Sequence, residues 1–223
     1  MKYTCCERLM WHIIVPASLR YLSERGWDAS ALKRKTKIIY RQMAERTPGI
    51  GGLIGNSLHI CLVAGIIWLS IYEAAEGKMD EECFGNMVVA GMESPIVKAS
   101  FTRKAKAAFT LTAQQKRAAK AARDNAASGG AFNWQAEVIL GRDAEEYTIL
   151  YRQCGLCALG RQEGLPQLVP YLCALDTLSI DWMGGALYRT KTLAIGGDCC
   201  DFYICKKDSK WDRERKEDPK NER

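Results

Sequence analysis

The chain has 223 residues, of which 48% are hydrophobic, and a formal net charge of +6. A chain of this length can bury one sizeable core without disulfide support, so size does not explain its ten cysteines. The surplus charge is local, because one alanine-rich stretch holds a single acid, Asp124, and seven bases: Arg103, Lys104, Lys106, Lys116, Arg117, Lys120 and Arg123. That stretch contains no nucleic-acid-reading motif. We therefore interpret it as a solvated helix face and expect no nucleic-acid partner.

The apolar segments are too short to indicate a secretion signal or a membrane span. Near the N-terminus, the run from Leu9 to Val15 is interrupted by His12, which makes a poor signal-peptide core. The longest apolar run, Leu58 to Tyr72, contains His59 and Ser70 and falls below the ~20 residues that cross a bilayer. We expect a buried helix there, and a soluble cytoplasmic protein whose thiols are not paired in disulfides.

Helical patterns dominate the first 127 residues. Residues 17–47 are predicted to be helical, with Asp28 and Ser30 as capping residues before Leu32. The apolar helix follows over about 56–75, and Asp80, Glu81 and Glu82 then place acids at the positive end of a helix that runs to about Gly91. The alanine-rich segment, 100–127, is predicted to form one further helix.

After residue 127 the pattern changes to alternation, which is typical of strands. Residues 132–140 and 146–152 predict a β-hairpin, 166–183 a helix, and 187–195 and 199–205 two short extended runs. The charged tail, 206–223, has Trp211 as its only large apolar residue and is predicted to be disordered. The expected fold is α+β in a single domain over 1–205, with a mainly helical part, 1–127, packed on a small antiparallel sheet with one C-terminal helix in the cysteine-rich part, 128–205.

The cysteines of this second part suggest a metal site. Cys154 and Cys157 form a Cys-x-x-Cys pair, and Cys173 with Cys199 or Cys200 could complete four thiolate ligands for one tetrahedral ion, zinc being the candidate. The alternative is that several of these thiols are small buried hydrophobic residues. The sequence leaves the cofactor open.

Acid, thiol and guanidinium groups gather around the last extended run. Strand alternation puts Cys199, Asp201, Tyr203 and Cys205 on one face, and Cys200, Phe202 and Ile204 on the core face. The nearest acid-base candidates are Asp176, Asp198 and Asp201. Arg189 is predicted either to bind a substrate carboxylate or to pair with one of these aspartates.

Several short motifs in this part carry a family resemblance: Cys154-x-x-Cys157, Glu163-Gly164-x-Pro166, Cys173-x-x-Asp176, Arg189-Thr190-Lys191-Thr192-Leu193 and Gly196-Gly197-Asp198-Cys199-Cys200-Asp201-Phe202. Together they resemble the L-2-amino-thiazoline-4-carboxylic acid hydrolase family. The resemblance implies hydrolysis of a small cyclic C–N/C–S substrate, giving N-carbamoyl-cysteine from 2-amino-thiazoline-4-carboxylate. The family commonly has arginine where this chain has Tyr203, so a possible substrate-binding cation is absent here.

We therefore predict two groups of functional residues. The catalytic group is Cys200, Asp201, Asp176 and Cys199, with Asp201 or Asp176 supplying a proton and either Cys200 or an activated water attacking the ring. The substrate-binding group is Arg189, Thr192 and Asp198. The family motif favours Cys200 over Cys199, and we follow the motif. The alternative function is a cysteine-ligated metal-binding or redox module without hydrolase activity, and the oligomeric state stays open.

Overall fold

The computed structural model describes residues 5–51, 56–127 and 129–217, and these divide into two compact units. The first consists of Met1–Val97 and Gly155–Cys173, and the second of Lys98–Cys154 and Ala174–Arg223. The predicted boundary near residue 127 does not coincide with this division. Each unit is built from two separate stretches of chain, so the cysteine-rich part contributes to both.

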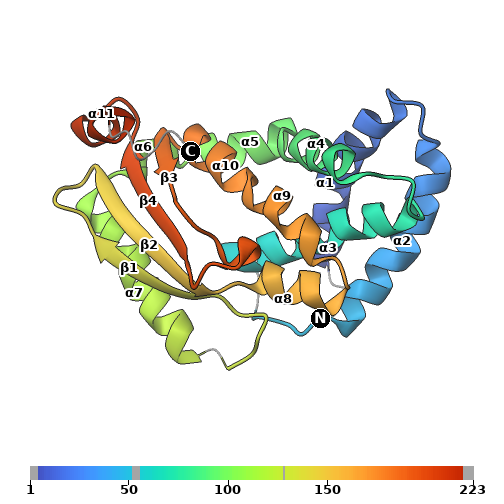
Figure 1. Cartoon of the computed structure of the whole chain (residues 1–223), viewed down its shortest axis with the longest axis horizontal. Helices are drawn as coiled ribbons and strands as arrows, with labels where there is room; N and C mark the ends of the chain where they lie inside the picture. The colour runs from blue at the N-terminus through green and yellow to red at the C-terminus, as the bar shows by residue number, and fades with distance from the viewer. Residues whose placement is uncertain (1–4, 52–55, 128, 218–223) are drawn as a thin grey trace. The chain divides into compact units, whose positions relative to one another are not determined.

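The first unit is helical (Figure 1). Its helices are α1 (Cys5–Ser23), α2 (Ala29–Arg46), α3 (Ser57–Ala74), α4 (Glu81–Met92), α8 (Gly155–Gln162), η1 (Pro166–Leu168) and α9 (Val169–Cys173). The predicted cap at Asp28 is confirmed, because its carboxylate accepts from the Ser30 and Ala31 amides, whereas Ser30 lies inside α2 and is not a cap. Of the acids predicted at the start of the next helix, Asp80 is its cap and accepts from the Cys83 amide. The apolar segment is the buried helix α3, with Leu62, Ile66 and Leu69 fully buried. In the described part of the chain, no helix is long and apolar enough to cross a membrane.

Three helical predictions need correction. Helix α1 begins at Cys5 and passes through Pro16, because Trp11, Ile14 and Val15 are buried on its inner face. The Cys-x-x-Cys pair leads into a helix, α8, that the sequence did not predict. The alanine-rich segment is interrupted, forming α5 (Pro95–Thr102), α6 (Ala105–Ala108) and α7 (Leu111–Ala127).

The last interruption has a local cause at Phe109. Its backbone leaves the helical region, with φ −109° and ψ 72°, and its ring contacts Tyr147 at 6.3 Å between centroids. The next residue, Thr110, then caps α7 by accepting from the Ala113 amide. Packing of one aromatic residue therefore outweighs the helix propensity of the flanking alanines.

The second unit contains a four-stranded antiparallel sheet, which confirms the α+β class within the described residues. Strand order is β1 (Gln135–Leu140), β2 (Glu146–Gln153), β4 (Cys200–Lys206) and β3 (Gly185–Tyr188), so β4 lies between β2 and β3 in Figure 1. The hairpin β1–β2 is the predicted one. In the register of the sheet, Tyr151 is opposite Cys200 and Tyr188 is opposite Tyr203. Helix α10 (Leu175–Trp182) packs beside β3.

Alternation along β4 separates two faces of the sheet. Cys200, Phe202 and Ile204 join Tyr147 and Ile180 in one buried cluster, so α10 covers this face through Ile180. Tyr203 and Cys205 point to the opposite face, as strand geometry requires. The predicted assignment of Cys200 to the core face is therefore confirmed.

Helix α7 covers the outer edge of β1 with side-chain hydrogen bonds. The Asn125 amide both donates to the Ala136 carbonyl, at 2.8 Å, and accepts from the Ala136 amide, at 3.0 Å. The Gln114 side chain accepts from the Gly141 amide and donates to the Glu146 carbonyl. Asn125 thus occupies the edge of β1 at Ala136, where an open strand edge would invite pairing with another chain, and Gln114 holds the turn between β1 and β2.

The prediction of a disordered tail is wrong for residues 206–217. Strand β4 continues to Lys206, and α11 (Lys210–Glu217) follows, with Trp211 and Asp212 buried. The Trp211 indole donates to Asp143 at 2.9 Å, and the Asp212 carboxylate accepts from the Tyr188 hydroxyl at 2.7 Å. One aromatic anchor and one buried acid thus compensate for the polar composition. Residues 218–223 of the predicted tail lie outside the described residues.

Candidate functional site

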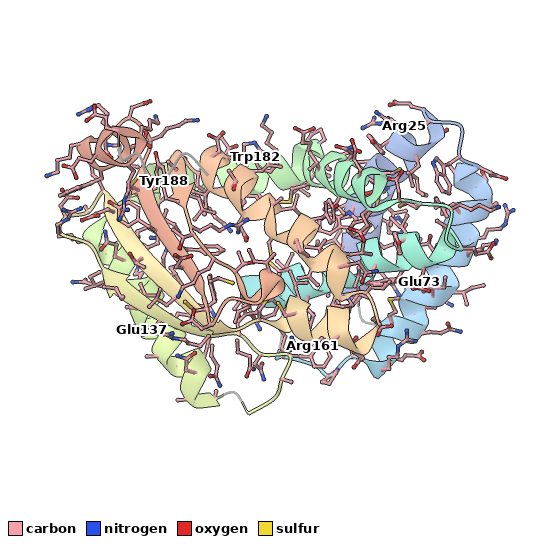
Figure 2. All side chains as sticks on the ribbon, viewed as in Figure 1. Arg25, Glu73, Glu137, Arg161, Trp182 and Tyr188 are labelled. Carbon is pink, nitrogen blue, oxygen red and sulfur yellow. The ribbon has the colours of Figure 1, made fainter. Side chains whose placement is uncertain are left out.

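The candidate site lies in the second unit, where the chain passes from β3 to β4. Tyr188, labelled in Figure 2, ends β3, and the chain then forms a loop that contains the short helix η2 (Leu193–Ile195). The loop turns back at Gly196, whose φ of +87° favours glycine, and the Gly197 amide donates to the Thr192 carbonyl at 2.9 Å. The predicted extended run 187–195 is therefore the end of strand β3, followed by a loop that a backbone hydrogen bond holds closed.

An ion pair between Asp176 and Arg189 is the central feature of the site. Arg189 Nη1 lies 3.2 Å from Asp176 Oδ2, and the Asp176 side chain keeps 40% of its surface exposed. The crowded surroundings desolvate this carboxyl and raise its pKa to about 6, although Arg189 acts to lower it. Asp176 therefore exchanges a proton close to neutral pH while remaining accessible, a combination that suits an acid-base group.

Arg189 is held between this acid and the sheet. Its guanidinium carbon lies 5.5 Å from the centre of the Phe202 ring, and Phe202 in turn packs edge-on against Tyr151 at 5.2 Å. An aromatic face supports a guanidinium without consuming its hydrogen-bond donors. The plane of the guanidinium is therefore held in one orientation, as bidentate recognition of a carboxylate requires.

Cys200 lies beside this pair as a buried thiol. Its side chain belongs to the apolar cluster, and its Sγ accepts a hydrogen bond from the Leu193 amide at 3.3 Å. Burial raises the pKa of Cys200 above its ordinary value, and Cys154 and Asp176 add to this effect while Arg189 opposes it. The predominant form at neutral pH is therefore the thiol, which is a weaker nucleophile than thiolate.

Asp201 has a different environment from Asp176. Its carboxylate accepts from the Thr190 amide at 3.0 Å, the Thr190 hydroxyl at 2.6 Å and the Lys191 amide at 2.9 Å. Burial acts to raise the pKa of Asp201, but these hydrogen bonds outweigh it and lower the pKa below the ordinary value. Asp201 is therefore held as an ionised carboxylate, a poor source of protons at neutral pH.

The positions of the other predicted residues give them no clear part in the chemistry of the site. Cys199 is buried, 3% exposed, immediately before β4. Thr192 is also buried, and its carbonyl is occupied by Gly197. Asp198 forms an exposed ion pair with Lys191 at 2.5 Å. The structure thus brings Asp176, Arg189 and Cys200 together and ties Asp201 and Asp198 to neighbouring loop residues.

The whole site falls within a match to a known family. The family model for L-2-amino-thiazoline-4-carboxylic acid hydrolase matches residues 62–204, which include Asp176, Arg189, Cys200 and Asp201. The chain belongs to this family. No significant match is found among curated proteins or among solved structures. The family name describes a hydrolase, and the matched segment ends within β4.

For this hydrolase family member, the interpretation of Tyr203 changes. The sequence suggested that tyrosine replaces a substrate-contacting arginine, but residue 203 points to the sheet face opposite Phe202. The Tyr203 hydroxyl donates to Glu146, and the Arg215 guanidinium carbon lies 4.2 Å from the centre of its ring. Position 203 is therefore part of the packing between the sheet and α11, away from the Asp176–Arg189 pair.

The predicted metal site is not supported in this family member. The described residues include no group of three or more histidine, cysteine, aspartate or glutamate side chains arranged to hold a metal ion. Cys157 and Cys173 belong to the first unit, whereas Cys154 belongs to the second. The metal site built on these cysteines therefore stays a prediction from their spacing along the chain.

Sequence reasoning missed two residues that shape the site. The motif Arg189-Thr190-Lys191 does not by itself indicate that Thr190 binds Asp201 through both its amide and its hydroxyl. Alternation predicts only a core role for Phe202, which also supports Arg189. The available signal was alternation along β4, which puts Cys200 and Phe202 on the same face.

Proposed function

We propose that the protein hydrolyses the ring of 2-amino-thiazoline-4-carboxylate or a closely related cyclic amidine. The observation that carries the proposal is the Asp176–Arg189 pair, with an accessible carboxyl of pKa about 6, inside the segment that matches the hydrolase family. The partner is thus a small anionic molecule. We place the reaction in the cytoplasm, where reducing conditions keep Cys200 as a thiol.

The chemistry requires addition of one water molecule. The ring carbon between nitrogen and sulfur is electrophilic, so water adds there and forms a tetrahedral intermediate. The carbon–sulfur bond then breaks, one water proton ends on the ring nitrogen and the other on the leaving sulfur, and the product is N-carbamoyl-cysteine. One carbon–oxygen bond forms, one carbon–sulfur bond breaks, and no oxidant or reductant is needed.

Asp176 supplies the acid-base function in this scheme. In its ionised form it accepts a proton from the attacking water, and in its protonated form it returns that proton to the leaving sulfur. A pKa of about 6 allows both forms to be populated near neutral pH. Asp201 is a poorer choice, because its hydrogen bonds from Thr190 and Lys191 favour the ionised state throughout.

Arg189 binds the substrate carboxylate next to this acid. A guanidinium has five N–H donors in one plane, so it can hold two carboxylates at once. The pair with Asp176 therefore brings the ring of the bound substrate close to the group that moves the proton. We assign the attack to water and not to Cys200, whose thiol is 6% exposed and has a raised pKa.

The test is incubation of the purified protein with 2-amino-thiazoline-4-carboxylate in ¹⁸O-labelled water, followed by mass spectrometry. We expect N-carbamoyl-cysteine with one ¹⁸O atom in the carbamoyl group. A trapped isothiourea adduct on a Cys200 peptide would instead assign the attack to the thiol. Absence of product from the wild type would overturn the proposed hydrolysis of this substrate.

A further inference from the structure

We infer that Asp201 is a positioning residue that orients Arg189 toward Asp176 and the substrate carboxylate, an inference that rests on the proposed function. Its carboxylate is the only acceptor described for three consecutive donors of the loop: the Thr190 amide, the Thr190 hydroxyl and the Lys191 amide. These donors immediately follow Arg189 in the chain. Asp201 therefore determines the path of the backbone from which the Arg189 side chain extends.

These hydrogen bonds to Asp201 are needed because the backbone pairing of β3 with β4 stops before the loop. The regular ladder between β3 and β4 ends at the pair Tyr188 and Tyr203. Beyond it, a single longer bond of 3.4 Å joins the Asp201 amide to the Lys191 carbonyl. The Asp201 side chain replaces the missing ladder by accepting from two successive backbone amides. Without it, the segment that carries Arg189 would lose its main attachment to β4.

A second hydrogen bond to β4 holds the other end of the same loop. The Leu193 amide donates to Cys200 Sγ at 3.3 Å, so adjacent residues of β4, Cys200 and Asp201, hold both ends of the stretch 190–193. Arg189 is the residue between this stretch and the end of β3. Its guanidinium crosses the Phe202 ring to reach Asp176, which requires a defined backbone direction at residue 189. Small errors in the placement of a binding group cause large losses of rate.

The central experiment is a double-mutant cycle with Asp201→Asn and Arg189→Met, assayed with 2-amino-thiazoline-4-carboxylate. The asparagine keeps the shape of the side chain but lacks the second carboxylate oxygen that accepts from the Thr190 hydroxyl. We expect Asp201→Asn to lower kcat/KM by up to about 100-fold, mainly through KM, and to have little further effect in the Arg189→Met background. Independent, multiplicative losses would overturn the inference.

A substrate analogue separates positioning of Arg189 from general damage. With 2-amino-2-thiazoline, which has no carboxylate, wild type and Asp201→Asn should turn over at similar rates. Asp181→Asn is the matched control, because Asp181 is an exposed aspartate whose ion pair with Lys207 lies outside the loop. It should leave both substrates unaffected. A comparable loss of both substrates in Asp201→Asn would mean that Asp201 acts on the fold as a whole.

A third measurement does not depend on turnover. NMR titration of the Asp176 carboxyl should show its pKa rise in Asp201→Asn and in Arg189→Met alike, because Arg189 acts to lower that pKa. If wild type does not hydrolyse the substrate but this shift appears, the proposed function fails while the positioning role stands. An unchanged Asp176 pKa in Asp201→Asn overturns the positioning role. Should Asp201→Asn not fold, Thr190→Val removes one donor to Asp201 and is tested in the same way.

Discussion

Two arginine–carboxylate pairs in the second unit have opposite electrostatic character. At Glu146, 4% exposed in its side chain, the carboxylate accepts from the Arg142 side chain, the Arg142 amide and the Tyr203 hydroxyl. Burial acts to raise the pKa of Glu146, but these donors outweigh it and lower the pKa. At Asp176 the only donor among the residues that the structure describes is Arg189, and desolvation raises the pKa to about 6.

The difference shows how the same residue types serve stability in one place and chemistry in another. A carboxylate surrounded by donors is locked in its charged form and contributes to the fold. A carboxyl with one partner and a desolvating environment keeps the freedom to exchange a proton. The number of donors, and not the presence of an arginine, separates the two pairs.

The largest expected contrast is in activity. Asp176→Asn should lower kcat for 2-amino-thiazoline-4-carboxylate by about 10²- to 10⁴-fold, the usual contribution of a general acid-base group. Glu146→Gln, with the same chemical change, should keep kcat within about threefold of wild type for the folded fraction, since Glu146 is assigned to the fold. Steady-state kinetics on both variants measure this. Equal losses would remove the distinction between the two pairs.

The contrast should reverse for stability. Glu146→Gln removes the charge that accepts from Arg142 and Tyr203, so we expect a loss of about 1.5–3 kcal/mol in unfolding free energy. Asp176→Asn should be nearly neutral or slightly stabilising at pH 7, because the native environment disfavours the charged carboxyl. Urea unfolding followed by tryptophan fluorescence compares them. A larger loss in Asp176→Asn would identify it as a structural ion pair.

A smaller effect should follow from Tyr203→Phe. Loss of the hydroxyl donor to Glu146 should cost about 1 kcal/mol of stability, while KM stays unchanged because residue 203 lies on the sheet face away from Arg189. Thermal unfolding and steady-state kinetics on one protein sample measure both quantities. A raised KM at full stability would return position 203 to the substrate site.

The smallest effect is a difference in the sign of the pH dependence. For Asp176, the folded pKa of about 6 lies above the ordinary value of 3.8, so the native state gains protons as pH falls from 7 toward 4 and stability rises with them. Glu146 has a lowered folded pKa, so its contribution is present above about pH 4.5 and disappears as pH falls further. Unfolding measured at pH 7, 5 and 3.5 in wild type and Asp176→Asn resolves the two. A rise toward pH 5 that persists in Asp176→Asn would assign it to another group.

The sequence predicted the local features of this protein well, because they depend on nearby residues. The cap at Asp28, the acids at the start of α4, the apolar helix α3, the hairpin β1–β2 and the core position of Cys200 all follow from short-range patterns. Motifs within 154–202 also indicated the family, and the family model confirms it. Helix α8, the break at Phe109 and helix α11 are not indicated by the sequence, since packing partners far along the chain stabilise each of them: α3 for α8, Tyr147 for Phe109 and Asp143 for α11.

For the site, the sequence by itself determined which groups are available: an arginine, several acids and the adjacent free thiols of Cys199 and Cys200. Only the tertiary structure decided which acid meets Arg189, because Asp176 and Asp201 are equally plausible from their spacing. Asp201 is satisfied by backbone amides of the β3–β4 loop, whereas Asp176 on α10 has the guanidinium. Solvation and hydrogen-bond donors set the pKa of a carboxyl, and both come from residues that are neighbours in space and not in sequence.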